Sequence, residues 1–423
     1  MPNFYPFRGL RYDKTRVDPN KVIAPPYDIV SPDQQQILAD RSLYNAIHIE
    51  LPQADPQHNL DPYQSAAKKL RDWHRDTILR QDGNECLYIY KMTYTISNSE
   101  DDSKLNTTTG VIGAVEIEYP YTLNPQILPH EKTLTKPKGD RLMLLQACKA
   151  NTSPIWGLSL DARLTVAIEQ ALADTYGDKL ADVAWRAVDD DGVVHELWAV
   201  EDPHSINSIR SSINNAPIVL ADGHHRYETA LQYAQELGEN KQEHEYRHDN
   251  HDDNRPPDYQ SVMALVVQLE KDQLHVHPIH RLISGLSQDF DITEAFTNFT
   301  NSSPVKINTN TGKTRNVEGI WVATGQNESL FDIATHPEDP DSVLLEAFFE
   351  NLPPHEITYE PDWNSALEQI RAGKVQAGIK VRPTTVEQIA HMAHNRKMMP
   401  PKTTYFHPKP RTGMVFRLLQ PLV

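Results

Sequence analysis

The chain has 423 residues, a formal net charge of −17 and two cysteines. This acidity disfavours binding to DNA and to anionic membranes, because both require clustered lysine and arginine. The spacing of Cys86 and Cys148 fits neither a disulfide framework nor a zinc site, and no apolar window is long enough to span a membrane. We therefore expect a cytoplasmic protein, and its length predicts two or three domains.

Signals for both helices and strands recur along the chain. The stretch SPDQQQILAD, which starts at Ser31, has a capping residue followed by proline and predicts a helix. Apolar residues at helical spacing predict another helix in PYQSAAKKLRDWHRDTIL (62–79). The stretches CLYIYKMTYT (86–95) and GVIGAVEIEY (110–119) are rich in β-branched and aromatic residues and predict a hairpin with a long loop.

The rest of the chain continues this mixture. Further helices are expected at 140–150, 163–177, 205–213, 224–237, 341–352, 364–373 and 384–394. Further strands are expected at 153–160, 195–200, 218–223, 261–270, 274–283, 319–325 and 376–381. We therefore predict a mixed α/β to α+β fold with several layers.

Two shifts in composition, near residue 205 and near residues 285–300, predict three regions. These are an N-terminal α/β region (1–205), a phosphate-binding region (206–285) and a C-terminal α+β region (286–423). The polar, aperiodic stretch at 239–260 is expected to be a solvated loop. It contains HEYRH (244–248), which matches the HExxH pattern of zinc hydrolases. No apolar helical face accompanies this pattern, so we expect it to be metal-free.

The stretch PIVLADGHHRYETALQYAQEL (217–237) carries the strongest functional signal. Its apolar strand stops at Asp222 and Gly223, a pair suited to a sharp turn, and a helix follows. The N–H groups and the positive dipole end of a helix start favour an anion, and His224, His225 and Arg226 add side-chain donors there. Asp222 could orient a histidine or hold Mg²⁺. We expect Arg226 to be exposed and dispensable for stability; the alternative is that these polar residues only cap the helix.

Other polar clusters lie in apolar surroundings. The stretch QILPHEKTLTKPKGDRLMLL (126–145) contains Glu131, a candidate general base, and Arg141, which could face an anionic substrate. An ordinary surface loop is the alternative for this stretch. In VIAPPYDIVSP, two consecutive prolines stiffen the backbone and hold the segment that carries Asp28 in an extended conformation. His280 and Arg281 form a second cationic pair. In the strand expected there, residues 275 and 277 share one face and residue 280 lies on the other.

Five stretches occur in the order found in a known family. They are APPYDIVSP, PHEKTLTKPKGDRLMLLQACKANTSPIWGL, ADGHHRYETA, HPIHRLI and MPPKTTYFHPKPRTGMVFRL. Together they resemble domain-of-unknown-function family number 1015, which is often labelled SpoOJ/ParB-related. ADGHHR in turn resembles the phosphate-binding motif of the ParB/sulfiredoxin superfamily, which includes free-serine kinases. This resemblance implies a ParB/sulfiredoxin-like α+β core around ADGHHR at 206–285.

Two members of that superfamily fit the chain poorly. Sulfiredoxin has a catalytic cysteine beside its motif, and this chain has none there. ParB proteins carry a helix-turn-helix DNA reader after the motif, whereas an acidic loop and strands follow here. We therefore expect neither sulfiredoxin chemistry nor DNA binding.

The residues and the resemblance together predict a nucleotide-dependent phosphotransferase or nucleotide hydrolase that acts on a small hydroxylated metabolite, similar to the free-serine kinases. The resemblance implies ATP or ADP as the cofactor, with Mg²⁺ held at Asp222. The expected catalytic residues are Glu131, Asp28 and His225. The expected nucleotide-binding residues are Asp222, Gly223, His224, His225, Arg226, His280, Arg281 and Arg141. The alternative is a non-catalytic nucleotide-binding regulator related to ParB.

Overall fold

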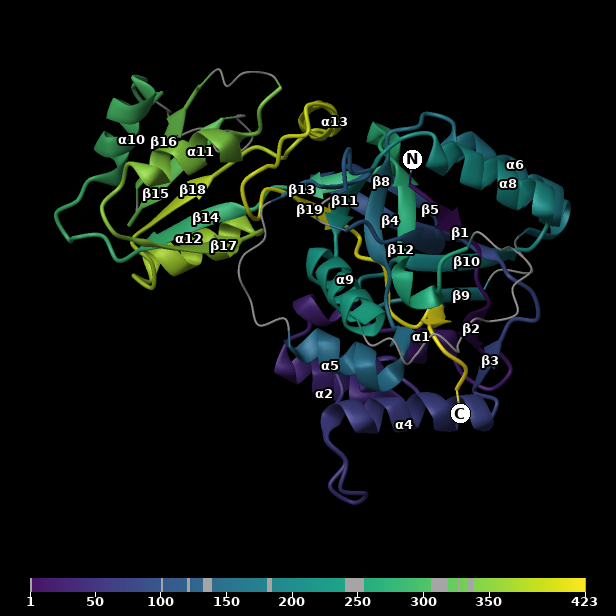
Figure 1. The fold of residues 1–423 in the computed structure, drawn as a ribbon. Helices are drawn as coiled ribbons and strands as arrows, with labels where there is room; N and C mark the ends of the chain where they lie inside the picture. Colours follow the sequence, from purple (N-terminus) through teal and green to yellow (C-terminus); the bar gives the residue numbers. More distant parts are fainter. Residues whose placement is uncertain are drawn as a thin grey trace. The chain divides into compact units, whose positions relative to one another are not determined.

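The computed structural model describes residues 2–99, 102–119, 122–131, 139–180, 185–239, 255–305, 319–325, 327–333 and 338–422. The chain divides into two compact units (Figure 1). Unit 1 contains Met1–Pro129, Thr135–Leu274 and Pro408–Val423, and unit 2 contains His130–Leu134 and His275–His407. In the described part of the chain, no helix combines the length and the apolar character needed to cross a membrane.

Unit 1 is built on a nine-stranded sheet with the strand order β6-β11-β8-β12-β5-β4-β10-β9, and β1 pairs with β5 beside this path. The strands are β1 (Phe4–Tyr5), β4 (Leu87–Ser99), β5 (Asp102–Glu116), β6 (Ile127–Pro129), β8 (Ile155–Ser159), β9 (Trp185–Val188), β10 (Val194–Val200), β11 (Ile218–Asp222) and β12 (Ser261–Gln268). The pairs β6–β11 and β8–β12 are parallel, and the others are antiparallel. β4 and β5 form the expected hairpin, but the predicted long loop is wrong, because the two strands remain paired as far as Ser99 and Asp102. Every residue of β12 is buried, because this apolar strand lies in the middle of the sheet.

A second, four-stranded sheet in unit 1 joins distant parts of the chain. Its order is β3-β2-β20-β7, with β2 (Gly9–Tyr12), β3 (Leu79–Gln81), β7 (Ala150–Asn151) and β20 (Phe416–Leu418). Because β20 pairs with β2 near the N-terminus, the C-terminal segment belongs to unit 1.

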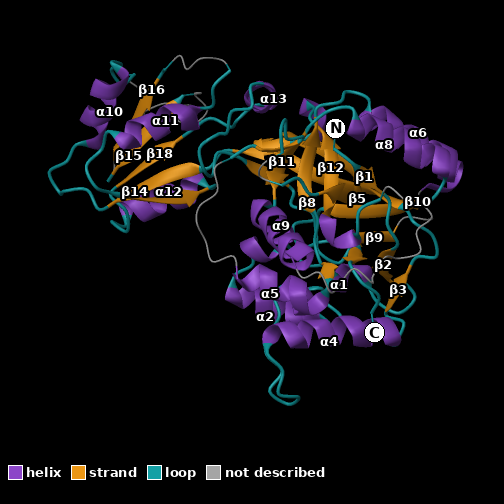
Figure 2. Cartoon of the chain, viewed as in Figure 1, coloured by secondary structure: helices purple, strands orange, loops and turns teal. Residues whose placement is uncertain are grey.

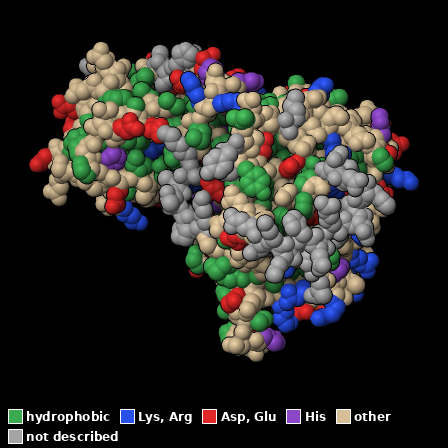
Figure 3. Space-filling view, in the orientation of Figure 1, with side chains coloured by type: hydrophobic (Ala, Val, Ile, Leu, Met, Phe, Trp, Pro, Cys, Tyr) green, Lys and Arg blue, Asp and Glu red, His purple; other side chains and the backbone are tan. Residues whose placement is uncertain are grey.

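Helices surround these sheets. They are α1 (Pro19–Val22), α2 (Pro32–Arg41), α3 (Ile47–Glu50), α4 (Pro62–Arg75), α5 (Gly139–Cys148), α6 (Leu164–Tyr176), α8 (Pro203–Asn214) and α9 (His224–Glu239), with short 3₁₀ helices η1 (Tyr27–Ile29), η2 (Gly177–Lys179), η3 (Asp258–Gln260) and η4 (Lys271–Gln273). α6 and α8 lie side by side (Figure 2), and with α9 they pack apolar residues against the large sheet. α4 buries Leu70 and Trp73, while Lys and Arg side chains gather over its outer face (Figure 3).

Unit 2 contains a five-stranded antiparallel sheet with the order β16-β15-β18-β14-β17. Its elements are β14 (His280–Ser284), α10 (Ile292–Thr300), β15 (Ile320–Thr324), β16 (Asn327–Phe331), α11 (Asp341–Glu350), β17 (Glu356–Glu360), α12 (Trp363–Arg371), β18 (Ala377–Lys380) and α13 (Val386–His394), with a separate pair β13 (His275–His277) and β19 (Tyr405–His407). Ile283 packs with α10 and α11, whereas its neighbour Leu282 packs with α12. The helices therefore cover opposite faces of this sheet (Figure 2).

The mixed α/β prediction is confirmed. The two units differ from the three regions that composition suggested. Residues 206–274 lie in unit 1, because β11 and β12 pair with β8 and β5 of the N-terminal part. Unit 2 begins before residue 285, because β14 is a strand of its sheet. The HEYRH segment (244–248) lies outside the described residues.

Candidate functional site

The ADGHHR stretch forms the turn from β11 into α9. The pairing of β11 with β8 shifts register between Leu220 and Asp222, an irregularity that redirects the end of the strand. Gly223 follows with φ of 85°, and a Cβ there would lie 3.1 Å from the Cα of Ile155. Glycine is therefore required at this turn. The N–H of Tyr227 donates to the carbonyl of Gly223 (2.9 Å), so the preceding N–H groups of α9 lie before its hydrogen-bond ladder.

The carboxylate of Asp222 binds two cations. Lys409 Nζ donates to Oδ1 (2.7 Å), and Arg226 Nη2 donates to Oδ2 (3.1 Å). All three side chains are largely buried, with exposed fractions of 17%, 7% and 14% in the order Asp222, Lys409 and Arg226. Burial acts to raise the pKa of Asp222, but Lys409 and Arg226 outweigh it and hold this pKa well below its ordinary value. Lys409, which sequence reasoning did not select, thus joins the C-terminal segment to the ADGHHR turn.

Arg226 is tied into the protein, contrary to the expectation that it is exposed. Besides its bond to Asp222, its Nη1 donates to Ser153 Oγ (3.1 Å) and to the carbonyl of Pro154. This correction has a simple cause: the first turn of α9 faces the segment that precedes β8 rather than solvent. The Nε of Arg226 is buried and has no hydrogen-bond partner among the described residues.

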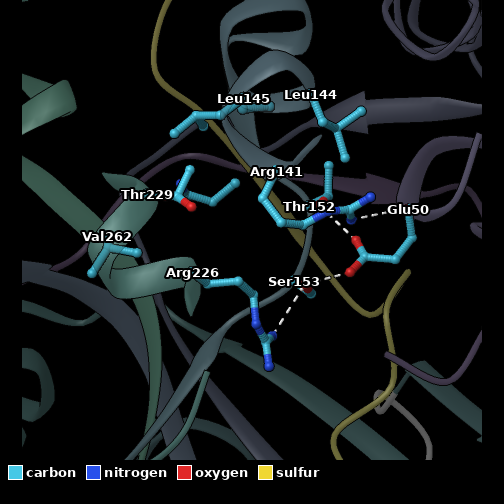
Figure 4. A pocket seen from close by; sticks show the side chains of 11 residues that line it. Glu50, Arg141, Leu144, Leu145, Thr152, Ser153, Arg226, Thr229 and Val262 are labelled. Atoms are coloured by element: carbon cyan, nitrogen blue, oxygen red, sulfur yellow. Dashed lines mark hydrogen bonds between the residues drawn. The ribbon is translucent and has the colours of Figure 1, made fainter. Parts of the chain in front are cut away.

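A buried carboxylate, Glu50, lies on the other side of Ser153 (Figure 4). Glu50 is only 1% exposed and accepts hydrogen bonds from Thr152 Oγ1 (2.6 Å) and Ser153 Oγ (2.9 Å). Arg141 Nη1 donates to the backbone carbonyl of Glu50 (2.7 Å). Glu50, Arg141, Ser153 and Arg226 line a cavity of about 50 Å³. This cavity is far smaller than a nucleotide site, so it is an inner recess beside the turn.

Tyr27 and Asp28 of η1 belong to the same site. The guanidinium of Arg141 lies over the ring of Tyr27, 4.2 Å from its centre. Burial raises the pKa of Tyr27, and the neighbouring Arg226 opposes this rise. Asp28 is exposed and interacts electrostatically with both Tyr27 and Arg226. Among the described residues, no hydrogen bond or ion pair engages the Asp28 carboxylate.

The two histidines of the turn are half-buried at the start of α9. His224 helps to lower the pKa of Asp222 through its positive potential. The Nε2 of His225 is buried and lacks a hydrogen-bond partner in the described part of the chain. The site in unit 1 therefore brings together the expected residues Asp28, Arg141, Asp222, Gly223, His224, His225 and Arg226.

Glu131 lies in unit 2, where other groups occupy its carboxylate. Thr404 donates to its Oε1 from both N–H and Oγ1 (2.7 Å each), and the N–H of Lys402 donates to Oε2 (3.0 Å). His130 Nε2 lies 3.2 Å from Oε1. Burial acts to raise the pKa of Glu131, but His130 and Thr404 outweigh it and lower this pKa to about 2. Such a carboxylate is a weak base.

His280 and Arg281 also lie in unit 2, on opposite faces of β14. His280 is 2% exposed, and its ring packs against Trp363, with centroids 5.2 Å apart. Burial, with Lys380 and Arg281 nearby, lowers the pKa of His280 to about 3, so this histidine is neutral. The pair therefore does not act as one cationic group. Residues 132–138, between Glu131 and Arg141, lie outside the described residues.

The donor set does not suit the expected metal. In the described ranges, no group of three or more His, Cys, Asp or Glu side chains is arranged to hold a metal ion. Both oxygens of Asp222 already accept from Lys409 and Arg226, and these two cations would repel a divalent ion. Asp222 is therefore an ion-pair residue, which corrects its expected role as the Mg²⁺ ligand.

Comparisons with known proteins give one clear match. The model of a family described as "Protein of unknown function (DUF1015)" matches residues 4–347. No curated protein matches the chain.

Several solved structures are distantly similar. A conserved hypothetical protein from Pyrococcus furiosus has a TM-score of 0.35 and 11% identity, over 69% of this chain and 90% of that one. Free serine kinase in complex with AMP has a TM-score of 0.35 and 14% identity, over 69% and 88%. SbnI with C-terminal truncation from Staphylococcus aureus has a TM-score of 0.35 and 12% identity, over 69% and 85%. Likeness at these TM-scores establishes neither a shared fold nor a shared function.

We expect Arg226→Ala to destabilise the nucleotide-free protein by on the order of 3 kcal/mol, because it removes one partner of a buried ion pair and leaves Asp222 with Lys409 alone. Arg226→Lys should recover part of this loss, since an ammonium cannot make all three contacts. Chemical denaturation measures the free energy of unfolding. The control is Arg75→Ala, whose side chain is 69% exposed and which should change that free energy by about 0.5 kcal/mol or less. If Arg226→Ala and the unchanged protein have the same free energy of unfolding, the expectation that Arg226 is exposed and binds a phosphate would hold instead.

Glu131 should make the stability of unit 2 depend on acid pH. Its folded pKa of about 2 lies below the ordinary value of 4.5, so its contribution is fully present above pH 4.5 and is lost as the pH falls toward 2. Glu131→Gln should cost about 3 kcal/mol at neutral pH and remove this pH dependence. Denaturation curves recorded across this pH range test both effects. The exposed Glu356→Gln serves as the control, and equal pH profiles for Glu131→Gln and the unchanged protein would contradict the prediction.

Proposed function

Because the chain belongs to the family of proteins of unknown function DUF1015, whose description names no activity, we propose a function from the chemistry of the site in unit 1. The protein is a nucleotide-dependent phosphotransferase or nucleotide hydrolase, with ATP or ADP at the start of α9 and a small hydroxylated metabolite as the acceptor. We also propose that β11, the turn after it and α9 together form a phosphate-binding element similar to that of the ParB/sulfiredoxin superfamily.

One observation carries the phosphate end of this proposal. Two buried nitrogens at the first turn of α9, His225 Nε2 and Arg226 Nε, have no acceptor among the described residues. Burying a hydrogen-bonding nitrogen without a partner is unfavourable, so such atoms call for an acceptor beyond the described residues, and a bound ligand would supply one. A phosphate oxygen at the turn meets this need, because the first N–H groups of α9 and its dipole favour the same anion.

The charge of the turn is compatible with an anion. Lys409 and Arg226 both pair with Asp222, which leaves one positive charge in excess within this trio. Asp222 therefore positions the two cations and does not repel the phosphate. Arg226 would bind the phosphate through Nε, in a position that its other contacts hold fixed. It would not bind two phosphate oxygens through Nη1 and Nη2, because these atoms already donate to acceptors in the protein.

Asp28 is the better candidate for the base that accepts the proton of the acceptor hydroxyl. It lies near Arg226 and Tyr27, and among the described residues no contact engages its carboxylate. Glu131 is held by Thr404, Lys402 and His130, and its pKa of about 2 makes it a weak base. Phosphoryl transfer depends mostly on positioning and charge, so a single weakly held carboxylate suffices for this role. No step of the proposal depends on a metal at Asp222.

For nucleotide binding, we expect His225→Ala to weaken the affinity for ATP or ADP by about ten- to a hundredfold, the loss of one hydrogen bond to a charged group. Titration of the purified full chain with each nucleotide measures the change. His204→Ala is the matched control, because His204 is also a histidine in the first turn of a helix, α8, but is exposed. If both variants bind as the unchanged protein does, or if no nucleotide binds at all, the phosphate site is not at this turn.

For turnover, we expect Asp28→Asn to retain nucleotide binding and to lower kcat by about 10²- to 10⁴-fold, the usual effect of a general base. The assay follows nucleotide consumption by phosphorus NMR, with water and with a panel of small hydroxylated acceptors. Asp33→Asn, an exposed aspartate in the first turn of α2, is the control. Nucleotide binding without turnover of any acceptor would support the alternative, a non-catalytic nucleotide-binding regulator.

A further inference from the structure

Unit 2 contains a cavity of about 340 Å³, well within the size range of small-molecule sites. Its polar lining comes from Arg281 of β14, Tyr359 of β17, and Ser342, Glu346 and Glu350 of α11. Phe349, Ile357 and the prolines at 400 and 401 supply apolar walls. The cavity lies on the α11 face of the five-stranded sheet, because Arg281 shares that face with Ile283.

Arg281 differs from the other arginines that are buried among the described residues. Arg141 pairs with Asp140 (2.6 Å), Arg411 with Asp191 (2.9 Å), and Arg417 with Asp258 (2.8 Å). Arg281 is 3% exposed, yet no carboxylate in the described ranges lies within ion-pair distance of it.

Among the described residues, no direct contact of Arg281 joins its guanidinium to a carboxylate. Its Nη1 donates to the carbonyl of Ile279, and its guanidinium lies 5.6 Å from the ring centre of Tyr359, its partner residue across the strands. Burial lowers the pKa of Arg281 and outweighs the opposing effect of Tyr359, Glu131 and Asp341. A buried guanidinium without a carboxylate is costly, and an anion that enters the adjoining cavity would offset that cost.

The opposite wall has the opposite charge. Ser342, Glu346 and Glu350 recur every four residues, so they lie along one face of α11. Glu346 is half-buried and Glu350 is exposed. A ligand that matches both walls carries a carboxylate toward Arg281 and a cationic amine toward the glutamates.

We propose that unit 2 binds a small zwitterion of the free amino acid class in this cavity, with the ligand carboxylate on Arg281 and its ammonium group facing Glu346 and Glu350. The apolar walls then surround the ligand side chain. This site is separate from the proposed nucleotide chemistry of unit 1 and does not depend on it.

The test uses the full chain and free L-amino acids, screened one at a time by thermal shift, with calorimetric titration of those that stabilise the protein. Each stabilising amino acid is compared with the matching amine that lacks the carboxylate, with the matching acid that lacks the amine, and with inorganic phosphate. We expect at least one amino acid to raise the melting temperature, neither analogue to do so, and inorganic phosphate not to compete with the amino acid.

Variants then locate the site. Arg281→Lys and Glu346→Gln should each weaken the amino acid affinity by about tenfold or more, while ATP binding stays unchanged. The controls Arg371→Lys and Glu368→Gln, on α12 and away from the cavity lining, should leave the affinity unchanged. Should Arg281→Lys fail to fold, Glu346→Gln decides, because Glu346 lies on a helix face and is not fully buried.

Several results would overturn the proposal. They are the absence of binding by any amino acid, equal affinity in Glu346→Gln and the unchanged protein, and equal binding of the acid that lacks the amine. Binding of inorganic phosphate in competition with the amino acid would show a site for anions in general and would also overturn the zwitterion assignment.

Discussion

The ion-pair trio of Asp222, Lys409 and Arg226 determines the geometry of unit 1. It joins two segments that are distant in sequence: the turn from the end of β11 into the first turn of α9, and the C-terminal segment that leads to β20. Through Ser153, the same arginine reaches Glu50 and the recess beside it. Because these side chains are mostly buried, the loss of one partner leaves an uncompensated charge in the interior. The positions of Ser153 and of the segment before β8 relative to the turn therefore depend on this trio.

The local part of this arrangement could be predicted from sequence. An apolar run that ends in Asp-Gly, followed by helical spacing, located the strand, the turn and the helix, because each signal acts within a few neighbouring residues. The surroundings of Arg226 could not be predicted in this way. Its partners Ser153 and Pro154 lie more than seventy positions away, and Lys409 lies 187 positions from Asp222. No periodicity in the lysine-containing stretch HPKPRTG indicated that its lysine would be buried on a carboxylate.

Glu131 shows a different limit of sequence reasoning. It stands only ten positions before Arg141, and proximity in sequence suggested a shared site. The chain instead passes from unit 1 into unit 2 at residue 130 and back at residue 135, because His130 and Glu131 bind the segment around Thr404. His280 and Arg281 are adjacent in sequence, but their side chains lie on opposite faces of β14, because neighbouring residues in a strand point to opposite faces.

The distribution of charge reconciles an acidic protein with the anion sites proposed for its two units. The net charge of −17 creates an outer field that repels polyanions such as nucleic acids. Inside each unit the dielectric constant is low, so a single buried polar group without a partner has a much larger local effect than the net charge of the protein. At the turn of unit 1 these groups are two nitrogens without a hydrogen-bond partner among the described residues, and in unit 2 the group is one arginine that no described carboxylate pairs with. Each is buried, so only a small ligand that fits a cavity or a helix end can reach it. The functional groups of such a chain are therefore found by asking which buried polar atoms the protein itself leaves unsatisfied, rather than by the overall charge.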